Sequence, residues 1–112
     1  MKQREIILTP FPFADLSGNK VIPALIVSNN EFNENSTDII ICAITSNIKN
    51  SKYSVTIDQR DLEDGKLFET SAVKVENILK INKSLILKTF ARLNKKRFSE
   101  VIRIIEDLTR QE

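Results

Sequence analysis

The groups that could do chemistry in this chain are hydroxyls, cations and carboxylates, because the 112-residue sequence contains no histidine. It contains a single cysteine, Cys42, inside the apolar string IIICAI. One thiol without histidine can form neither a Cys–His dyad nor the ligand set of a zinc site. A cysteine in such surroundings is typical of a small buried strand residue. We therefore expect no metal and no other cofactor.

Lys74 and Glu76 form the first candidate pair. Side chains two residues apart in an extended strand point to the same face, so the string Lys74-Val75-Glu76 places a cation beside a carboxylate. Such a pair can accept a proton and stabilise negative charge. The alternative is a surface ion pair that contributes under ~1 kcal/mol to stability. The residues alone leave both interpretations open.

Hydroxyl groups and one further lysine complete the set of candidates. Thr45 and Ser46 end the string AITS, after an apolar segment. Hydroxyls at a strand end can donate hydrogen bonds to a ligand, but they commonly only cap a turn. Lys20 closes a proline-containing segment and is either a solvated loop residue or a contact for an anion.

Short apolar segments bounded by turn residues predict a mainly β protein. The expected strands are Glu5–Thr9, Val21–Ser28, Asp38–Thr45, Tyr53–Ile57, Ser71–Ile81 and Leu85–Leu93. A helix is the competing prediction for the last of them. Pro23 predicts an edge position or a bulge in the second strand. We expect a loop over residues 10–20 and, over 58–66, a polar connection whose helical turn is closed by Gly65.

The clearest helical pattern lies at the end of the chain. There the apolar stripe has i, i+3, i+4, i+7 spacing and consists of Phe98, Val101, Ile102, Ile105 and Leu108. Asn94 is a suitable N-cap for this helix. Five to seven short strands and one terminal helix, without strand–helix alternation, predict a small antiparallel barrel or sandwich. The length predicts a single domain over residues 1–112.

Charge is distributed unevenly. Residues 1–73 carry 7 basic and 10 acidic side chains, whereas residues 74–112 carry 10 basic and 5 acidic ones. Such asymmetry can mark an anionic partner such as nucleic acid, or simply a solvated surface. No apolar run approaches the ~18 residues that span a bilayer. The first residues, MKQREIILTPF, lack the pattern of a signal peptide, so we expect a cytoplasmic protein without a membrane contact.

Five strings, taken in order, resemble the PemK/MazF family of toxins from bacterial type II toxin–antitoxin systems. They are PFPFADLSG, IPALIVSN, IIICAITS, GKLFETSAVKVENI and INKSLILKTFARL. The resemblance implies an SH3-like small β-barrel with a C-terminal helix, forming a homodimer. It also implies metal-independent, sequence-selective cleavage of single-stranded RNA. The implied protein partners are a cognate antitoxin and, through the antitoxin complex, operator DNA.

The resemblance also implies roles for individual residues. Its catalytic candidates are Thr45, Ser46, Lys74 and Glu76. The two hydroxyls would donate hydrogen bonds to the scissile phosphate, the carboxylate would act as general base, and the lysine would stabilise charge. Its candidates for contact with nucleic acid are Lys20 and three residues of the first loop, Asp15, Ser17 and Gly18.

One position departs from the family pattern. An arginine is expected immediately before the proline of the second strand, but Ile22 precedes Pro23 here. Isoleucine can neither neutralise a phosphate nor donate a hydrogen bond to it. Lys20 is near enough to replace the arginine in part, as a point charge without the bidentate fork. The alternatives are therefore a degenerate module that binds antitoxin or nucleic acid without cleavage, and a gyrase-directed poison with the same fold.

Overall fold

The computed structural model describes residues 1–12, 19–49 and 51–112. Its strands are β1 (Glu5–Pro12), β2 (Asn19–Ile26), β3 (Asp38–Thr45), β4 (Ser54–Ile57), β5 (Leu62–Gly65), β6 (Ser71–Asn82) and β7 (Lys88–Leu93). Its α-helices are α1 (Asn30–Asn35) and α2 (Lys95–Leu108). Two single 3₁₀ turns, η1 (Gln59–Asp61) and η2 (Lys83–Leu85), precede β5 and β7. Neither α-helix is both long enough and apolar enough to cross a membrane.

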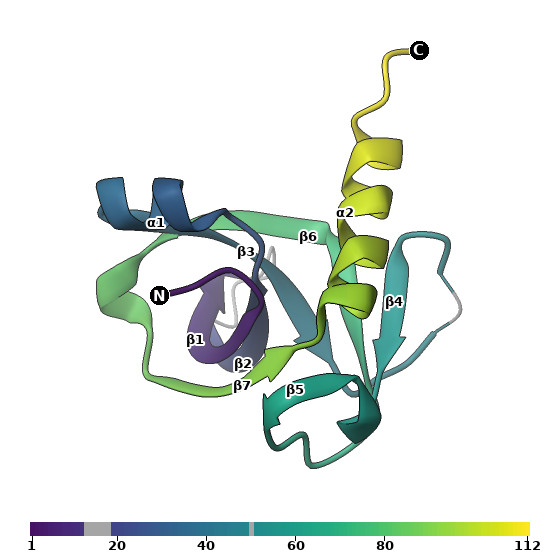
Figure 1. Ribbon diagram of the computed structural model, residues 1–112, viewed down its shortest axis with the longest axis horizontal. Helices are drawn as coiled ribbons and strands as arrows, with labels where there is room; N and C mark the ends of the chain where they lie inside the picture. Colours follow the sequence, from purple (N-terminus) through teal and green to yellow (C-terminus); the bar gives the residue numbers. More distant parts are fainter. Residues whose placement is uncertain (13–18, 50) are drawn as a thin grey trace.

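The seven strands form one antiparallel sheet in the order β4-β6-β3-β2-β1-β7-β5. The sheet curls into a half-barrel, and α2 packs against β4 and β6 (Figure 1). This confirms the prediction of a mainly β, SH3-like small barrel with a C-terminal helix. Strands that are neighbours in the sheet but distant in sequence, such as β3 and β6, bring the candidate residues together.

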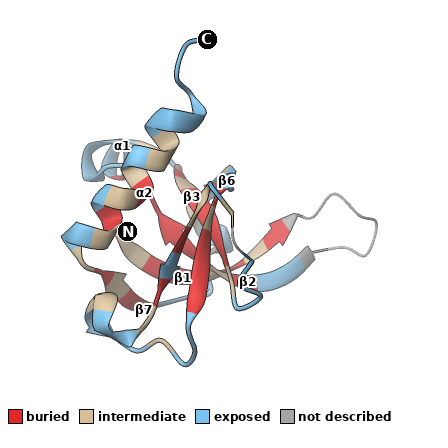
Figure 2. Ribbon diagram, turned by 90° about the vertical axis from the view of Figure 1, so that its right-hand side faces the viewer, coloured by how far each residue is buried: buried red, intermediate tan, exposed pale blue. Residues whose placement is uncertain are grey.

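Strand β3 is buried on both faces, which explains its unbroken apolar sequence. Cys42 belongs to the cluster that α2 covers with Val101. Ile41 and Ala43, its neighbours on either side, belong to a second buried cluster. Figure 2 marks such buried strand positions in red, within a shell of exposed residues. The two clusters fix β3 and hence the position of the hydroxyl at its end.

The predictions for three segments need correction. The expected loop over residues 10–20 is wrong at both ends, because β1 continues to Pro12 and β2 begins at Asn19. The expected polar connection over 58–66 contains strand β5 as well as the turn η1. Helix α1 was not expected, and it is only six residues long with a single buried residue, Asn33. These segments lack apolar periodicity because they are short or lie at the rim of the sheet.

The structure also decides the predictions for the last strand, Pro23 and Gly65. Residues 88–93 form a strand rather than the competing helix. The prediction of an edge position or a bulge at Pro23 is wrong, because β2 lies between β1 and β3 and its pairing with β1 has no register shift there. The pairing of β2 with β3 begins only at Ala24, so the proline removes no hydrogen bond from that pairing. Gly65 does not close a helical turn. It ends β5 with a φ of 87°, where an added Cβ would lie 2.2 Å from the carbonyl oxygen of Phe90.

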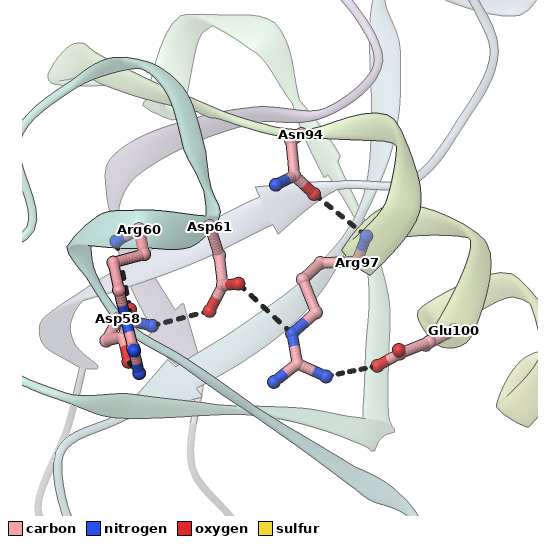
Figure 3. Close-up of polar contacts among 6 residues, drawn as sticks. All are labelled: Asp58, Arg60, Asp61, Asn94, Arg97 and Glu100. Atoms are coloured by element: carbon pink, nitrogen blue, oxygen red, sulfur yellow. Dashed lines mark hydrogen bonds and ion pairs between the residues drawn. The ribbon is translucent and has the colours of Figure 1, made fainter.

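Polar contacts join the start of α2 to the turn before β5 (Figure 3). As predicted, Asn94 caps the helix, and its Oδ1 accepts a hydrogen bond of 2.9 Å from the backbone N–H of Arg97. The Arg97 guanidinium donates to Asp61 at 3.2 Å and also to Glu100. A cation in the first turn opposes the helix dipole, and here two carboxylates offset it. Asp61 also accepts the backbone N–H of Asp58 at 2.9 Å.

Candidate active site

Three neighbouring strands, β2, β3 and β6, surround a hollow of about 270 Å³. The hollow contains three of the candidates, Lys20 from the start of β2, Thr45 from the end of β3 and Lys74 from β6. Among the described residues, its polar lining consists of Lys20, Thr45, Asn47, Lys49, Lys74 and Asn77. The lining therefore offers hydrogen-bond donors and positive charge, the groups that bind a phosphate.

Lys74 and Glu76 lie together, as the same-face argument predicted. The Lys74 Nζ lies 3.8 Å from Oε1 of Glu76, and both side chains are about one-third exposed. Lys74 is level with Ala43 of β3, but the next register position pairs Cys42 with Ile78. Three residues of β6 therefore form a bulge that breaks the ladder beside the hollow. Bulges of this kind re-aim side chains and are frequent next to active sites.

Among the described residues, the Thr45 side chain makes one hydrogen bond, and this bond leaves its O–H donor unused. Its Oγ1 accepts the backbone N–H of Asn47 at 3.1 Å, which is the turn-capping contact that the sequence also allowed. Because this contact uses a lone pair of the hydroxyl oxygen, the O–H remains able to donate. The residue is half-buried at the edge of the hollow. One hydroxyl can thus both hold the turn and contact a ligand.

Two of the candidate residues, Ser46 and Glu76, line other hollows. Ser46 lines a separate, larger hollow of about 620 Å³, where it lies with Pro23 and Phe90. The structure therefore does not bring Ser46 and Thr45 to one cavity, although they are adjacent in sequence. The candidates in the first loop, Asp15, Ser17 and Gly18, lie outside the described residues. Their roles stay predictions.

Ile22 lies in the wall of the same hollow as Lys20 and Thr45. It is buried, with 9% exposure, and belongs to the second core cluster. An arginine at this position would begin at the wall of the hollow, which is consistent with the role that the resemblance implies for it. In this chain the wall is apolar there. Lys20 is the adjacent cation, but it lacks the fork that binds two phosphate oxygens at once.

The structure adds three residues to the site that the sequence did not indicate. Asn47 and Lys49 follow the end of β3, and Asn77 lies in the bulge of β6. No local pattern marks them, because polar residues after a strand normally only form a turn. They reach the hollow because β2 and β6 flank β3 on either side. Among the residues that the structure describes, no three acidic, cysteine or histidine side chains are grouped to hold a metal.

A seven-stranded antiparallel half-barrel with a C-terminal helix is a MazF-like fold. The structure superimposes on the toxin MazF-mt6 of Mycobacterium tuberculosis with a TM-score of 0.79 at 17% identity, covering 97% of this chain and 99% of that one. A MazE–MazF structure from Deinococcus radiodurans gives a TM-score of 0.80 at 18% identity, covering 100% and 98%. A mycobacterial endoribonuclease in complex with its cognate antitoxin gives 0.80 at 18%, again covering 100% and 98%.

The sequence itself defines the family. Residues 2–109 match the family of PemK-like, MazF-like toxins of type II toxin–antitoxin systems. No curated protein sequence matches the chain significantly. Because the family match spans nearly the whole length, this chain belongs to the PemK/MazF family. At 17–19% identity, the solved structures confirm its fold.

Proposed function

We propose that this chain is the toxin of a type II toxin–antitoxin pair and acts as a metal-independent, sequence-selective endoribonuclease on single-stranded RNA. One observation carries the proposal. Lys20, Thr45 and Lys74, from three different strands, line one hollow, and the Glu76 carboxylate lies 3.8 Å from the Lys74 ammonium. Family membership and the mycobacterial endoribonuclease of the same fold support the choice of RNA.

The proposed reaction transfers the scissile phosphate to the neighbouring ribose oxygen. Glu76 takes the proton of the 2′-hydroxyl, whose oxygen then forms a bond to phosphorus. The bond from phosphorus to the 5′-oxygen breaks, and that oxygen takes up a proton from a lysine ammonium or from water. The lysines of the hollow and the Thr45 hydroxyl stabilise the charge that develops on the phosphate. The products are a 2′,3′-cyclic phosphate and a 5′-hydroxyl.

Cleavage of a long single-stranded RNA tests the proposal. The protein, freed of any antitoxin, is incubated with RNA in EDTA, and the ends of the fragments are mapped. We expect discrete cuts that leave cyclic phosphates. Glu76→Gln should lower the rate by about 10²–10⁴-fold, since this is the usual contribution of a general base. Thr45→Val should lower it by roughly 10²-fold, as loss of a transition-state hydrogen bond does.

Two matched variants serve as controls. Thr56→Val removes a hydroxyl from an exposed position of β4, and Glu106→Gln neutralises an exposed carboxylate of α2. Both should cleave at the unchanged rate. Equal losses in Glu76→Gln and Glu106→Gln would contradict the assigned role of Glu76. Arrest of bacterial growth with intact RNA, relieved by mutations in gyrase, would instead favour the gyrase-directed poison.

Ile22 supports a second candidate function. In a degenerate module the same hollow would bind nucleic acid or antitoxin without cutting, because the apolar wall lacks the arginine expected there. Absence of cleavage on every RNA tested, together with cleavage by the Ile22→Arg variant, would establish this alternative. We propose a homodimer, a cognate antitoxin and operator DNA, through the antitoxin complex, as partners in both cases. The solved MazE–MazF complex from Deinococcus radiodurans supports the antitoxin partner.

A further inference from the structure

A second polar hollow lies where the chain enters β1. Its volume is about 400 Å³, and it is lined by Lys2, Gln3, Arg4, Asn30, Arg92 and Lys95. These residues come from the segment around the start of β1, the start of α1, the end of β7 and the start of α2 (Figure 1). Four of the six carry a positive charge, and every one has hydrogen-bond donors.

This basic hollow is separate from the candidate active site. The backbone N–H of Arg4 donates to the carbonyl oxygen of Ile26, at the end of β2, at 3.0 Å. Ile22, which lines the active-site hollow, lies four residues earlier on the same strand, about 13 Å away at the rise of an extended chain. One phosphate group cannot contact both hollows.

The four cations differ in their partners. Arg4 pairs with Glu63 and also donates to the carbonyl oxygen of Leu93 at 2.9 Å, and Arg92 lies 3.8 Å from a carboxylate oxygen of Glu5. These two arginines are therefore partly neutralised. Among the described residues, no carboxylate forms an ion pair with the side chain of Lys2 or Lys95. The hollow thus contains two lysine side chains that form no ion pair with the described residues.

The backbone at Arg4 is also unusual. Its φ of 78° lies in the left-handed region that favours glycine, and it is the only non-glycine residue with a positive φ in the described part of the chain. Both backbone groups of Arg4 form hydrogen bonds. Its N–H donates to Ile26, and its carbonyl oxygen accepts the N–H of Leu93 at 2.8 Å. Strained positions of this kind tend to occur at functional sites. Here the residue with this backbone conformation is one of the cations that line the hollow.

The cations of the hollow also affect a neighbouring carboxylate, that of Glu63. The pKa of Glu63 is lowered, first by the hydrogen bond from Arg4 and further by the nearby charges of Arg92 and Lys95. Three of the four cations thus stabilise the same anion at the rim of the hollow. An added anion of the right size would experience the same cations, together with Lys2.

We propose that this basic hollow binds a backbone phosphate of a nucleic acid strand, as a contact additional to the active site. The chemistry of its lining favours phosphate, because guanidinium, ammonium and amide groups supply donors around one small volume. Asn30 already accepts the Gln3 N–H at 2.9 Å through Oδ1, so its amide hydrogens remain available to a ligand. An acidic peptide would also bury apolar side-chain atoms, and the six polar residues of this lining offer little apolar surface for them. Only the identity of the strand as RNA rests on the proposed function.

Binding to a strand that cannot be cleaved tests the inference independently of catalysis. The probe is a fluorescent single-stranded 12-nucleotide 2′-O-methyl RNA, and anisotropy gives its affinity between 50 and 300 mM salt. The double variant Lys2→Gln, Lys95→Gln should bind about tenfold more weakly at ~0.1 M salt. Its log–log salt slope should fall in magnitude by about 0.7 for each phosphate contact that is lost. Inorganic phosphate should compete with the probe on the parent protein.

The matched control removes the same charge elsewhere. Lys96→Gln, Arg110→Gln changes two exposed cations of α2 and the tail, neither of which lines the hollow. This variant should keep at least half of the parent affinity and the parent salt slope. Equal losses in the two double variants, or none in either, would overturn the inference. A third outcome would also overturn it. If the double variant Lys2→Gln, Lys95→Gln bound a glutamate-rich peptide more weakly than the parent protein does but bound the RNA probe equally well, the hollow would be a site for acidic protein.

Discussion

At the scale of single residues, the candidate active site depends on a few polar groups whose partners are known. Lys74 has one carboxylate partner at 3.8 Å, and Thr45 uses only its acceptor, so each retains capacity for a ligand. Lys20 lies at the same hollow, whereas Ile22 supplies an apolar wall to it. The strength of phosphate binding at this site is therefore set by lysines, which act as point charges.

Replacement of Ile22 tests how much the absence of an arginine at this position lowers the rate of cleavage. Ile22→Arg should raise the rate of RNA cleavage by about 10–100-fold, because a bidentate guanidinium stabilises a phosphate better than a lysine does. The same change should reduce stability by roughly 1–3 kcal/mol, since it places a charge at a buried position. Cleavage rates and thermal unfolding are measured together. Ile22→Lys should give a smaller gain, and a gain equal to that of Ile22→Arg would contradict the bidentate argument.

Cys42 should be chemically inert in the folded protein. Burial, assisted by the negative charge of Glu76, raises the pKa of its thiol to about 12. Because only the thiolate reacts, its population at pH 8 is about 10⁻⁴. A thiol reagent such as Ellman's should therefore react at least ~100-fold more slowly with the native chain than with the chain in denaturant. Rapid reaction of the native protein would show that β3 opens readily.

At the scale of elements, β3 and α2 were predictable and β5 was not. β3 has the bounds Asp38–Thr45 that its apolar run predicted, and α2 begins after the predicted N-cap Asn94. The sequence of β5, LEDG, has no buried residue and hence no apolar alternation. It is a strand because it pairs with the edge of β7, and pairing with a distant strand leaves no local signal in the sequence.

Gly65 is the residue that makes this pairing possible. A Cβ at this position would lie 2.2 Å from the Phe90 carbonyl oxygen and 2.5 Å from the Ala91 Cα, and both are backbone atoms. The φ of 87° adds strain for any other residue. Gly65→Ala should lower the free energy of unfolding by roughly 2–4 kcal/mol in urea denaturation. Lys66→Ala, at the exposed next position, should change it by less than about 0.5 kcal/mol.

At the scale of the whole molecule, the basic groups do not follow the division of charge along the chain. The active-site hollow combines Lys20 and Lys49 from the acidic first part with Lys74 from the basic second part. The basic hollow likewise combines Lys2 and Arg4 with cations of β7 and α2. The asymmetry of charge along the sequence was compatible with an anionic partner or with a solvated surface, and it located no site. The curl of the sheet decides which charges meet.

The assembly proposed for this family member is a testable property of the whole molecule. We expect the purified chain to be a homodimer at micromolar concentration, so light scattering should give about twice the chain mass of 12.8 kDa. Dilution should shift the mass toward the monomer only at concentrations near the dissociation constant. A monomer mass at every concentration would contradict the proposed dimer. Addition of a cognate antitoxin should raise the mass further and stop the cleavage of RNA.

The sequence by itself determined the mainly β class, the terminal helix, the family and the types of residue available for catalysis. Apolar periodicity and capping are local, so they can be read from consecutive residues. Only the tertiary structure decided that Thr45 and Ser46 line different hollows, and that Lys49 and Asn77 join the site. Those facts depend on β2 and β6 flanking β3, and strands far apart in sequence become neighbours only through the packing of the whole sheet.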